Sequence, residues 1–202
     1  MEHKDIFRRE LSIFREHGGI MSTGQAISSG IHPRKLYAMR DSGALSRVSR
    51  GWYRLADMPP FSDPDLVMAA LKVPQGVICL ISALAFHEIT TQVPHEVHLA
   101  LPKGAQAPRL DHPPLRIYRF LAEAYTEGAE EHGIDGIPVR IYNIEKTLAD
   151  CFKFRNKIGQ DVAVEALQIS WRSRSLDLNK LMHYAHICRV ENVMRPYLEA
   201  LL

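Results

Sequence analysis

Residues 20–55 read IMSTGQAISSGIHPRKLYAMRDSGALSRVSRGWYRL and carry the strongest structural signal in the chain. Either Ser22 or Thr23 can cap a short helix whose body covers residues 25–28. Ser29-Gly30 would end this helix, because glycine gives the backbone the freedom that a tight turn between helices needs. The apolar residue that follows, Ile31, is expected to fill the angle between this helix and the next one.

A second helix is predicted over residues 33–42. Pro33 suits its first turn, where the missing N–H would have no partner inside the helix, and Gly43 ends it. Leu36 and Met39 are three residues apart, so they share a face that we place on the core. The opposite face carries Arg34, Tyr37, Ala38 and Asp41, and it is flanked by Lys35 and Arg40.

A hairpin should follow the second helix, because two short runs surround a glycine-containing turn at residues 49–51. Arg47, Arg50 and Arg54 are expected on or near its tip. A basic two-stranded ribbon beside a helix with a basic face is typical of a winged helix-turn-helix. Such a module docks its second helix in the DNA major groove and grips phosphates or the minor groove with the wing.

The distribution of charge favours this interpretation. Residues 1–56 hold 10 Lys and Arg against 5 Asp and Glu, whereas residues 57–202 hold 15 against 18, so the positive charge is concentrated in the first segment. The alternative for the cations of the second helix is an ordinary solvated face. Asp41 either reads a cytosine amino group or forms an ion pair with Arg34 or Arg40, and we favour the ion pair.

The flanking segments complete the first domain. Residues 5–17 predict a helix whose apolar side packs on the second helix and the hairpin base; this side is formed by Ile6, Leu11, Ile13 and Phe14. Three prolines within residues 57–64 then break the chain. The predicted fold class is α+β, with a winged helix-turn-helix domain over residues 1–56 and a C-terminal α/β domain over residues 62–202.

The C-terminal domain is predicted to be a small sheet with a helical end. Strands are expected at residues 76–81, 95–101, 115–120 and 137–142, and helices at 65–72, after 81, and at 143–154, 161–172, 177–188 and 191–202. The second strand alternates polar and apolar residues, as a half-buried strand does. Ser82 and Asn143 are expected to cap helices, and the acidic residues 121–136 to form an exposed helix or loop.

No catalytic, metal or cofactor site is predicted. His95 and His98 would point to opposite faces of a strand, which disfavours a metal pair. Glu145 and Asp150 are five residues apart and poorly aligned on a helix, which disfavours an acid and base cluster. The sequence also lacks a Walker A motif, a Gly-x-Gly-x-x-Gly fingerprint and a Gly-x-Ser-x-Gly elbow.

The charged residues after Asn143 allow two interpretations. Asp150 shares a side of its helix with Lys146 and Lys153, so an ion pair or a cap is its expected role. The basic cluster could form a second nucleic-acid or partner surface, but we favour a solvated helix face; its members are Lys146, Lys153, Arg155 and Lys157.

The remaining sequence features concern the compartment and assembly. No apolar run is long enough to span a bilayer, and the start MEHKDIFRRELS lacks the apolar region of a signal peptide. Three distant cysteines, Cys79, Cys151 and Cys188, disfavour a zinc site and a disulfide framework, and they fit a reducing cytoplasm. The sequence contains no heptad repeat that would predict a coiled-coil dimer, so it does not distinguish a monomer from a dimer.

Two segments carry a family resemblance. Residues 29–55 resemble the N-terminal domain of AbiEi-type transcriptional regulators, the antitoxins of type IV toxin–antitoxin systems. Residues 141–168, IYNIEKTLADCFKFRNKIGQDVAVEALQ, resemble the C-terminal part of the same proteins. The resemblance implies a regulator that binds repeats near its own promoter and represses a two-gene operon. It also implies a neighbouring nucleotidyltransferase-like toxin, whose effect is countered without a stable complex.

The resemblance also implies roles for individual residues. Arg34, Lys35 and Tyr37 lie where the recognition helix would meet bases and phosphates, and Arg47 and Arg50 lie where the wing would meet the backbone. Trp52 and Tyr53 match the hydrophobic wing strand and are given structural roles. The complete predicted DNA-binding set is Ser28, Arg34, Lys35, Tyr37, Arg40, Arg47 and Arg50.

The predicted function is a sequence-specific DNA-binding repressor with an antitoxin role, and not an enzyme. Its predicted partners are double-stranded DNA and the linked toxin, with no membrane and no cofactor. The alternatives are a nuclease that the winged domain targets to DNA, and a stand-alone regulator that binds a partner protein.

Overall fold

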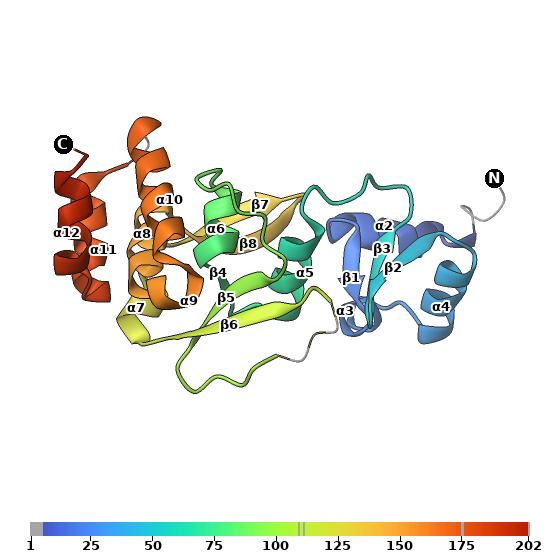
Figure 1. The fold of residues 1–202 in the computed structure, drawn as a ribbon. Helices are drawn as coiled ribbons and strands as arrows, with labels where there is room; N and C mark the ends of the chain where they lie inside the picture. The colour runs from blue at the N-terminus through green and yellow to red at the C-terminus, as the bar shows by residue number, and fades with distance from the viewer. Residues whose placement is uncertain (1–5, 109, 111, 175, 202) are drawn as a thin grey trace. The chain divides into compact units, whose positions relative to one another are not determined.

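The computed structural model describes residues 6–108, 110, 112–174 and 176–201. It combines helices with two separate sheets (Figure 1), so the predicted mixed α+β class is confirmed. The chain forms two compact units, Met1–Phe61 and Ser62–Leu202, which we call the N-terminal unit and the C-terminal unit. Among the described residues, no helix combines the length and the apolar character needed to cross a membrane.

Within residues 6–61, the N-terminal unit contains three helices and three short strands. They are α2 (Arg8–Glu16), β1 (Ile20–Ser22), α3 (Thr23–Ser28), α4 (Pro33–Asp41), β2 (Leu45–Ser49) and β3 (Trp52–Leu55). The strands form an antiparallel sheet in the order β1-β3-β2. The sequence predicted a ribbon of two strands, but the sheet has three, because the residues of β1 that lead into α3 also pair with β3.

Helix α2 differs in part from its prediction. The predicted start, Asp5, lies outside the described residues, and Ile6 is 64% exposed. Phe7 takes its place in the core, because Phe7, Leu11 and Phe14 follow the spacing of one helical stripe and Ile6 does not. The predicted packing of this helix is confirmed, since its apolar stripe shares one core with α4, β2 and β3.

The predicted start and end of α3 are confirmed. The Ser22 hydroxyl accepts the Gln25 N–H at 3.1 Å, and the Gln25 side chain accepts the Ser22 N–H at 2.8 Å, which forms a capping box. Gly30 ends the turn with a φ of +87°, where a Cβ would be strained. Ile31 then lies in the core at 1% exposure, as expected.

The C-terminal unit contains five strands and eight helices within the described residues. They are α5 (Pro64–Lys72), β4 (Val77–Ile78), α6 (Leu80–Phe86), β5 (Val97–Pro102), β6 (Leu115–Phe120), α7 (Ala122–Thr126), β7 (Ala129–Ile134), β8 (Ile137–Tyr142), α8 (Ile144–Lys153), α9 (Arg155–Ile158), α10 (Gln160–Arg172), α11 (Leu178–Cys188) and α12 (Glu191–Glu199). Asn143 accepts the Lys146 N–H at the start of α8, so its predicted cap is confirmed. Asp63, which was not predicted as a cap, accepts the Leu66 N–H at the start of α5. The predicted end of the last helix, Leu202, lies outside the described residues.

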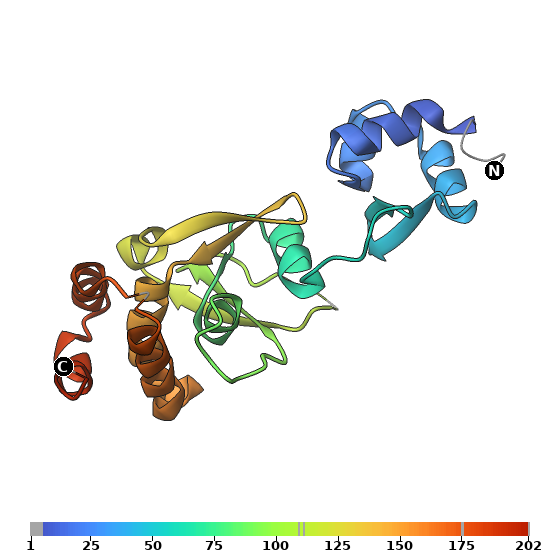
Figure 2. The same ribbon diagram turned by 90° about the horizontal axis from the view of Figure 1, so that it is seen from above.

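The five strands form one mixed sheet in the order β6-β5-β4-β8-β7. The pairs β5–β6 and β4–β8 are parallel, and the pairs β4–β5 and β7–β8 are antiparallel. The helices that follow β8, coloured orange to red, gather beside one end of this sheet (Figures 1 and 2). Tyr142, Leu148, Phe152 and Leu167 are fully buried in the core that joins the sheet to these helices.

Two predictions about the start of this sheet are wrong. The strand predicted at residues 76–81 is only Val77–Ile78, and helix α6 already begins at Leu80. Ser82 lies inside this helix and does not cap it. Its hydroxyl accepts the His98 N–H at 2.9 Å and donates to the Glu96 carbonyl, so it joins α6 to the segment that begins β5.

Two further segments differ from the structures that their sequence patterns predicted. Strand β5 is buried along Val97–Leu101 and is not half-buried, because its one polar side chain there, His98, is buried as well. The acidic residues 121–136 contain α7 and the strand β7. Glu130 and Glu131 are exposed on β7, and its place at the edge of the sheet accommodates their charges.

The expectation of a solvated basic face is wrong for Lys146. Its side chain and that of Asp150 are both 0% exposed, and Nζ lies 2.5 Å from Oδ2. The reason is that α8 is central in this unit, packed against α6, α10 and α11. The predicted ion pair of Asp150 is thus confirmed, whereas only Lys157 of the cluster is fully on the surface, and Lys153 and Arg155 are half-buried.

Candidate nucleic-acid interface

Helix α4 presents one face to the core and the other to solvent. His32 caps it by accepting the Arg34 N–H at Nδ1, and Pro33 occupies the first turn, as predicted. Leu36 and Met39 are completely buried, so their predicted place on the core is confirmed. We call the opposite side the outer face; its residues Arg34, Tyr37, Ala38 and Asp41 are all exposed, as predicted.

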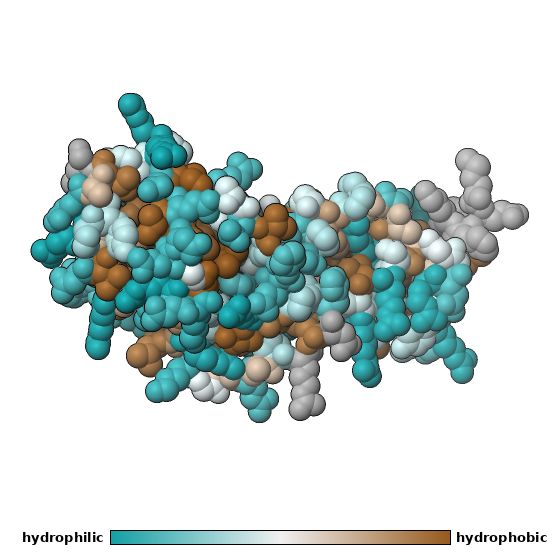
Figure 3. Space-filling model, viewed as in Figure 1, coloured by the Kyte–Doolittle hydropathy of each residue, from teal (hydrophilic) through white to brown (hydrophobic). Residues whose placement is uncertain are grey.

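The outer face offers polar and aromatic groups to a ligand. The guanidinium of Arg34 has no hydrogen-bond or ion-pair partner within the described part of the chain, and Tyr37 is 42% exposed. On the neighbouring helix α3, Ser28 and Ile27 are also exposed. The surface over α4 is hydrophilic in the view of Figure 3. Arg34 can therefore reach a phosphate or a base edge without first breaking an ion pair.

The two flanking cations of α4 are paired within the unit. The Lys35 ammonium lies 2.6 Å from the Glu10 carboxylate of α2. Arg40 forms an ion pair with Asp41 at 2.7 Å, which confirms the pairing favoured from the sequence, and its guanidinium lies 5.3 Å from the centre of the Tyr37 ring. These contacts hold both side chains against the helix surface.

The Lys35 contact also affects the acidity of Glu10. Burial by itself would raise the pKa of this carboxyl. The hydrogen bond from Lys35 and the nearby charges of Lys35 and Arg9 outweigh the burial, so the pKa lies below its ordinary value. Glu10 is therefore ionised near neutral pH, and the ion pair with Lys35 persists there.

The hairpin β2–β3 is tied to the start of α3. Its turn residue Gly51, at a φ of +76°, offers its carbonyl to the Thr23 N–H at 2.8 Å and to the Thr23 hydroxyl at 3.3 Å. A register shift between Arg47 and Ser49 bends β2 at this point. Arg47 and Arg50 are exposed beside the turn. The hairpin thus carries its cations at a fixed position relative to α3.

Arg54 was expected near the hairpin tip, and this prediction is wrong. It lies on the central strand β3, opposite Ile20 and Ser46, and is only 7% exposed. Its guanidinium lies 4.1 Å from the centre of the Phe61 ring and donates to the Pro59 carbonyl. Arg54 thus fastens the segment after β3 to the sheet and does not face a ligand.

Sequence reasoning missed Arg9. Its guanidinium lies 3.9 Å from the position that a Cβ on Gly30 would take, so it reaches the turn between α3 and α4. It is exposed, and its side chain forms no ion pair with another described residue. The helix 5–17 was interpreted only for its apolar side, although the excess of positive charge in residues 1–56 already included this residue.

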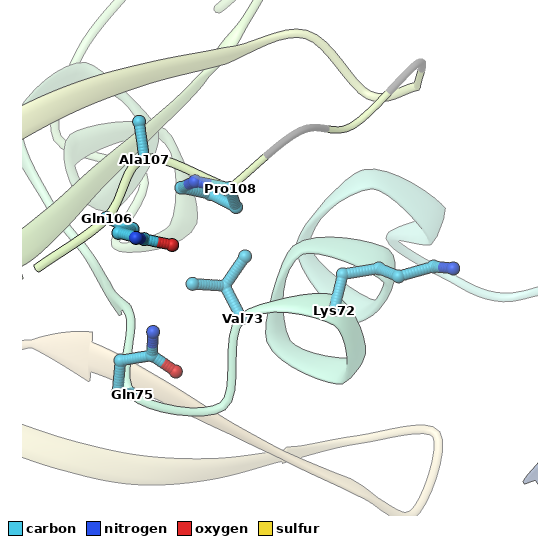
Figure 4. Close-up of a pocket in the computed structure, with 6 residues that line it drawn as sticks. All are labelled: Lys72, Val73, Gln75, Gln106, Ala107 and Pro108. Atoms are coloured by element: carbon cyan, nitrogen blue, oxygen red, sulfur yellow. The ribbon is translucent and has the colours of Figure 1, made fainter. Parts of the chain in front are cut away.

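The C-terminal unit offers little chemistry by comparison. A pocket of about 580 Å³ is lined by Lys72, Val73, Gln75, Gln106, Ala107 and Pro108. Lys72 is the one charged residue among these six described residues, and Figure 4 shows its side chain extended away from the two glutamines. The three cysteines are free and buried. The described residues contain no group of three His, Cys, Asp or Glu that could hold a metal ion.

Comparisons with known proteins fall into two kinds. No curated protein matches the chain by sequence. Among solved structures, the chain is similar to the crystal structure of the RV2827C protein from Mycobacterium tuberculosis, with a TM-score of 0.58 and 14% identity. The match covers 96% of this chain and 79% of that one. At this identity the likeness shows the fold alone.

The second kind of comparison concerns the segment that forms the candidate interface. A family model described as "Transcriptional regulator, AbiEi antitoxin" matches residues 3–56. This match contains α2, α3, α4 and the hairpin, and it confirms the resemblance stated for residues 29–55. The N-terminal unit, over residues 3–56, is thus the part of this chain that matches the AbiEi antitoxin family of transcriptional regulators.

Proposed function

We propose that this chain is a sequence-specific DNA-binding regulator whose N-terminal unit is a winged helix-turn-helix. In this proposal α4 is the recognition helix and the β2–β3 hairpin is the wing. The observation that carries the proposal is the outer face of α4, from which Arg34 and Tyr37 project while Leu36 and Met39 hold the other side in the core. The family match over the same residues supports it.

The proposed contacts with DNA are of two chemical kinds, those with base edges and those with phosphates. Arg34 is suited to a guanine edge, whose O6 and N7 accept a guanidinium in a bidentate manner. Arg47, Arg50 and Ser28 are suited to phosphates, as is Arg9 beside the inter-helix turn. Because phosphate contacts release counterions, affinity should fall steeply as the salt concentration rises. Base readout and phosphate contacts can therefore be separated by experiment.

The regulatory role extends this proposal. We propose that the chain represses its own operon by binding repeats near its promoter in the cytoplasm. It would counter a genetically linked nucleotidyltransferase-like toxin as a non-enzymatic antitoxin, without a stable complex. The family description, which names both transcriptional regulation and antitoxin activity, supports this extension for residues 3–56. In this proposal the C-terminal unit, which lies outside the matched residues, is the part that counters the toxin.

Replacing Arg34 with alanine should weaken binding to DNA from upstream of the gene by about 5-fold to 150-fold, because a lost bidentate base contact costs about 1–3 kcal/mol. A gel-shift titration with a salt series and a scrambled competitor measures this effect. Arg15→Ala is the matched control, since Arg15 is exposed on α2 and contacts Asp57 at 3.5 Å. Equal affinity of the two variants would contradict the assignment of α4 as the recognition helix.

A further inference from the structure

The cations of α4 differ in how far they are available to a ligand. Arg34 is exposed and unpaired within the residues that the structure describes. Lys35, the next residue, has its ammonium 2.6 Å from a Glu10 oxygen. The side chain of Glu10 is only 6% exposed, whereas that of Lys35 is 55% exposed. The carboxylate is therefore the buried partner, and Lys35 is the cation that neutralises it.

Pairing of this kind constrains Lys35 strongly. A buried carboxylate that loses its hydrogen-bonded cation is costly. The charge of Arg9 also favours ionised Glu10, but Lys35 is the cation that donates a hydrogen bond to it. Lys35 would leave Glu10 in that state if it turned outward to a phosphate. An exposed pair such as Arg40–Asp41, in contrast, can open at little cost. The chemistry of this ion pair thus opposes the DNA contact that the sequence suggested for Lys35.

The same ion pair can set the orientation of the helix. The apolar contacts of Leu36 and Met39 hold α4 on the core, but such contacts have no preferred direction. A hydrogen-bonded ion pair on the flank of the helix does have one. Successive residues of a helix are about 100° apart around its axis. Fixing Lys35 against α2 therefore also fixes the directions in which Arg34 and Tyr37 point.

We propose that Lys35 is a positioning residue: with Glu10 it locks the rotation of α4, so that Arg34 and Tyr37 face the DNA. This inference rests on the proposed function, and it changes which residues of α4 contact the ligand. The Glu10–Lys35 pair acts through Arg34 and Tyr37 and makes no contact with a base or a phosphate.

Glu10→Gln separates this role from a direct contact, because the two predict opposite signs. If Lys35 bound a phosphate, removing the Glu10 charge would free the ammonium and strengthen DNA binding. For a positioning role, the variant should bind specific DNA about tenfold more weakly, with the salt dependence of the wild type. Lys35 stays hydrated in this variant, since it is already 55% exposed, so the unit is expected to fold.

Two further variants complete the test. Glu16→Gln removes the same charge from the exposed end of α2, where the carboxylate accepts a hydrogen bond from the Ser12 hydroxyl. This variant should bind at least as tightly as the wild type. Lys35→Met should keep the wild-type slope of log affinity against log salt. A lost phosphate contact would instead reduce this slope by about 1. Faster amide hydrogen exchange in α4 of Glu10→Gln should accompany the weaker binding.

The outcomes distinguish the inference from the proposed function. If the wild-type chain binds the upstream DNA no more tightly than scrambled DNA, the proposed function is overturned, and the positioning role with it. If the wild type binds, a Glu10→Gln variant as tight as Glu16→Gln overturns the positioning role alone. A reduced salt slope for Lys35→Met overturns it as well and returns Lys35 to the phosphate contacts.

Discussion

Lys146→Met is expected to destabilise the C-terminal unit by about 3–5 kcal/mol, because it leaves the buried carboxylate of Asp150 without its cation. Burial raises the pKa of Asp150, and Lys146 and the Cys188 thiol oppose this rise. The ammonium also lies 4.1 Å from the centre of the Tyr142 ring. No water reaches either charge, since both side chains are 0% exposed.

Urea unfolding of the full chain measures this loss. Trp171 lies in the C-terminal unit and Trp52 in the N-terminal unit, so a Trp52→Phe background lets the fluorescence report the C-terminal unit alone. Lys153→Met on the same helix is the matched control, because this lysine is half-buried and outside the pair. It should change stability by about 0.5 kcal/mol or less.

The double variant Lys146→Met/Asp150→Leu tests the cause. Apolar replacement of both members of a buried ion pair is often neutral. The double variant should therefore be at least about 2 kcal/mol more stable than Lys146→Met alone. A double variant that is as unstable as Lys146→Met would show that packing around α8, and not the unpaired carboxylate, causes the loss.

Local signals account for what could be predicted of the fold. The Ser22 capping box, the Gly30 turn and Pro33 all act within a few residues, so the sequence places α3 and α4 correctly. The exposed outer face of α4 follows in the same way from the spacing of Leu36 and Met39. That this face contacts DNA stays a prediction.

Features that depend on distant residues were missed or misjudged. Arg54 seemed to belong to a hairpin tip, and only the pairing of β1 with β3 makes its strand central. Lys146 seemed to belong to a solvated face, and it is buried because α8 packs against α6, α10 and α11. The contact between Lys35 and Glu10 joins residues 25 positions apart. Local periodicity contains no information about such tertiary contacts.

Acid should destabilise the C-terminal unit through His98, which is 3% exposed on β5. Burial lowers its pKa to about 4, although Glu96 opposes the shift; the charge of Arg116 adds to it. An unfolded histidine titrates near pH 6.5. Between these two values the unfolded state binds a proton that the folded state does not, so stability falls as the pH falls. The loss from pH 7.5 to 4.5 should be about 2–3 kcal/mol.

His98→Phe should remove this part of the pH dependence. The ring of His98 lies beside that of Tyr118, with centroids 5.3 Å apart, and its Nδ1 has no hydrogen-bond partner among the described residues. Its Nε2 lies 3.9 Å from a Glu96 oxygen, which is beyond hydrogen-bond distance, so a phenyl ring can replace the imidazole without breaking a hydrogen bond. Urea unfolding at pH 7.5 and 4.5, followed by Trp171, should show a smaller loss for the variant than for the wild type.

His95→Phe provides the comparison that makes the result specific. His95 is exposed and three residues away, so this variant also loses one histidine but no buried one. It should keep the acid sensitivity of the wild type. Carboxylates elsewhere in the unit contribute equally to all three proteins, so the difference between the two variants isolates His98. Equal pH dependence of His98→Phe and His95→Phe would mean that His98 becomes hydrated, and titrates normally, in the folded state.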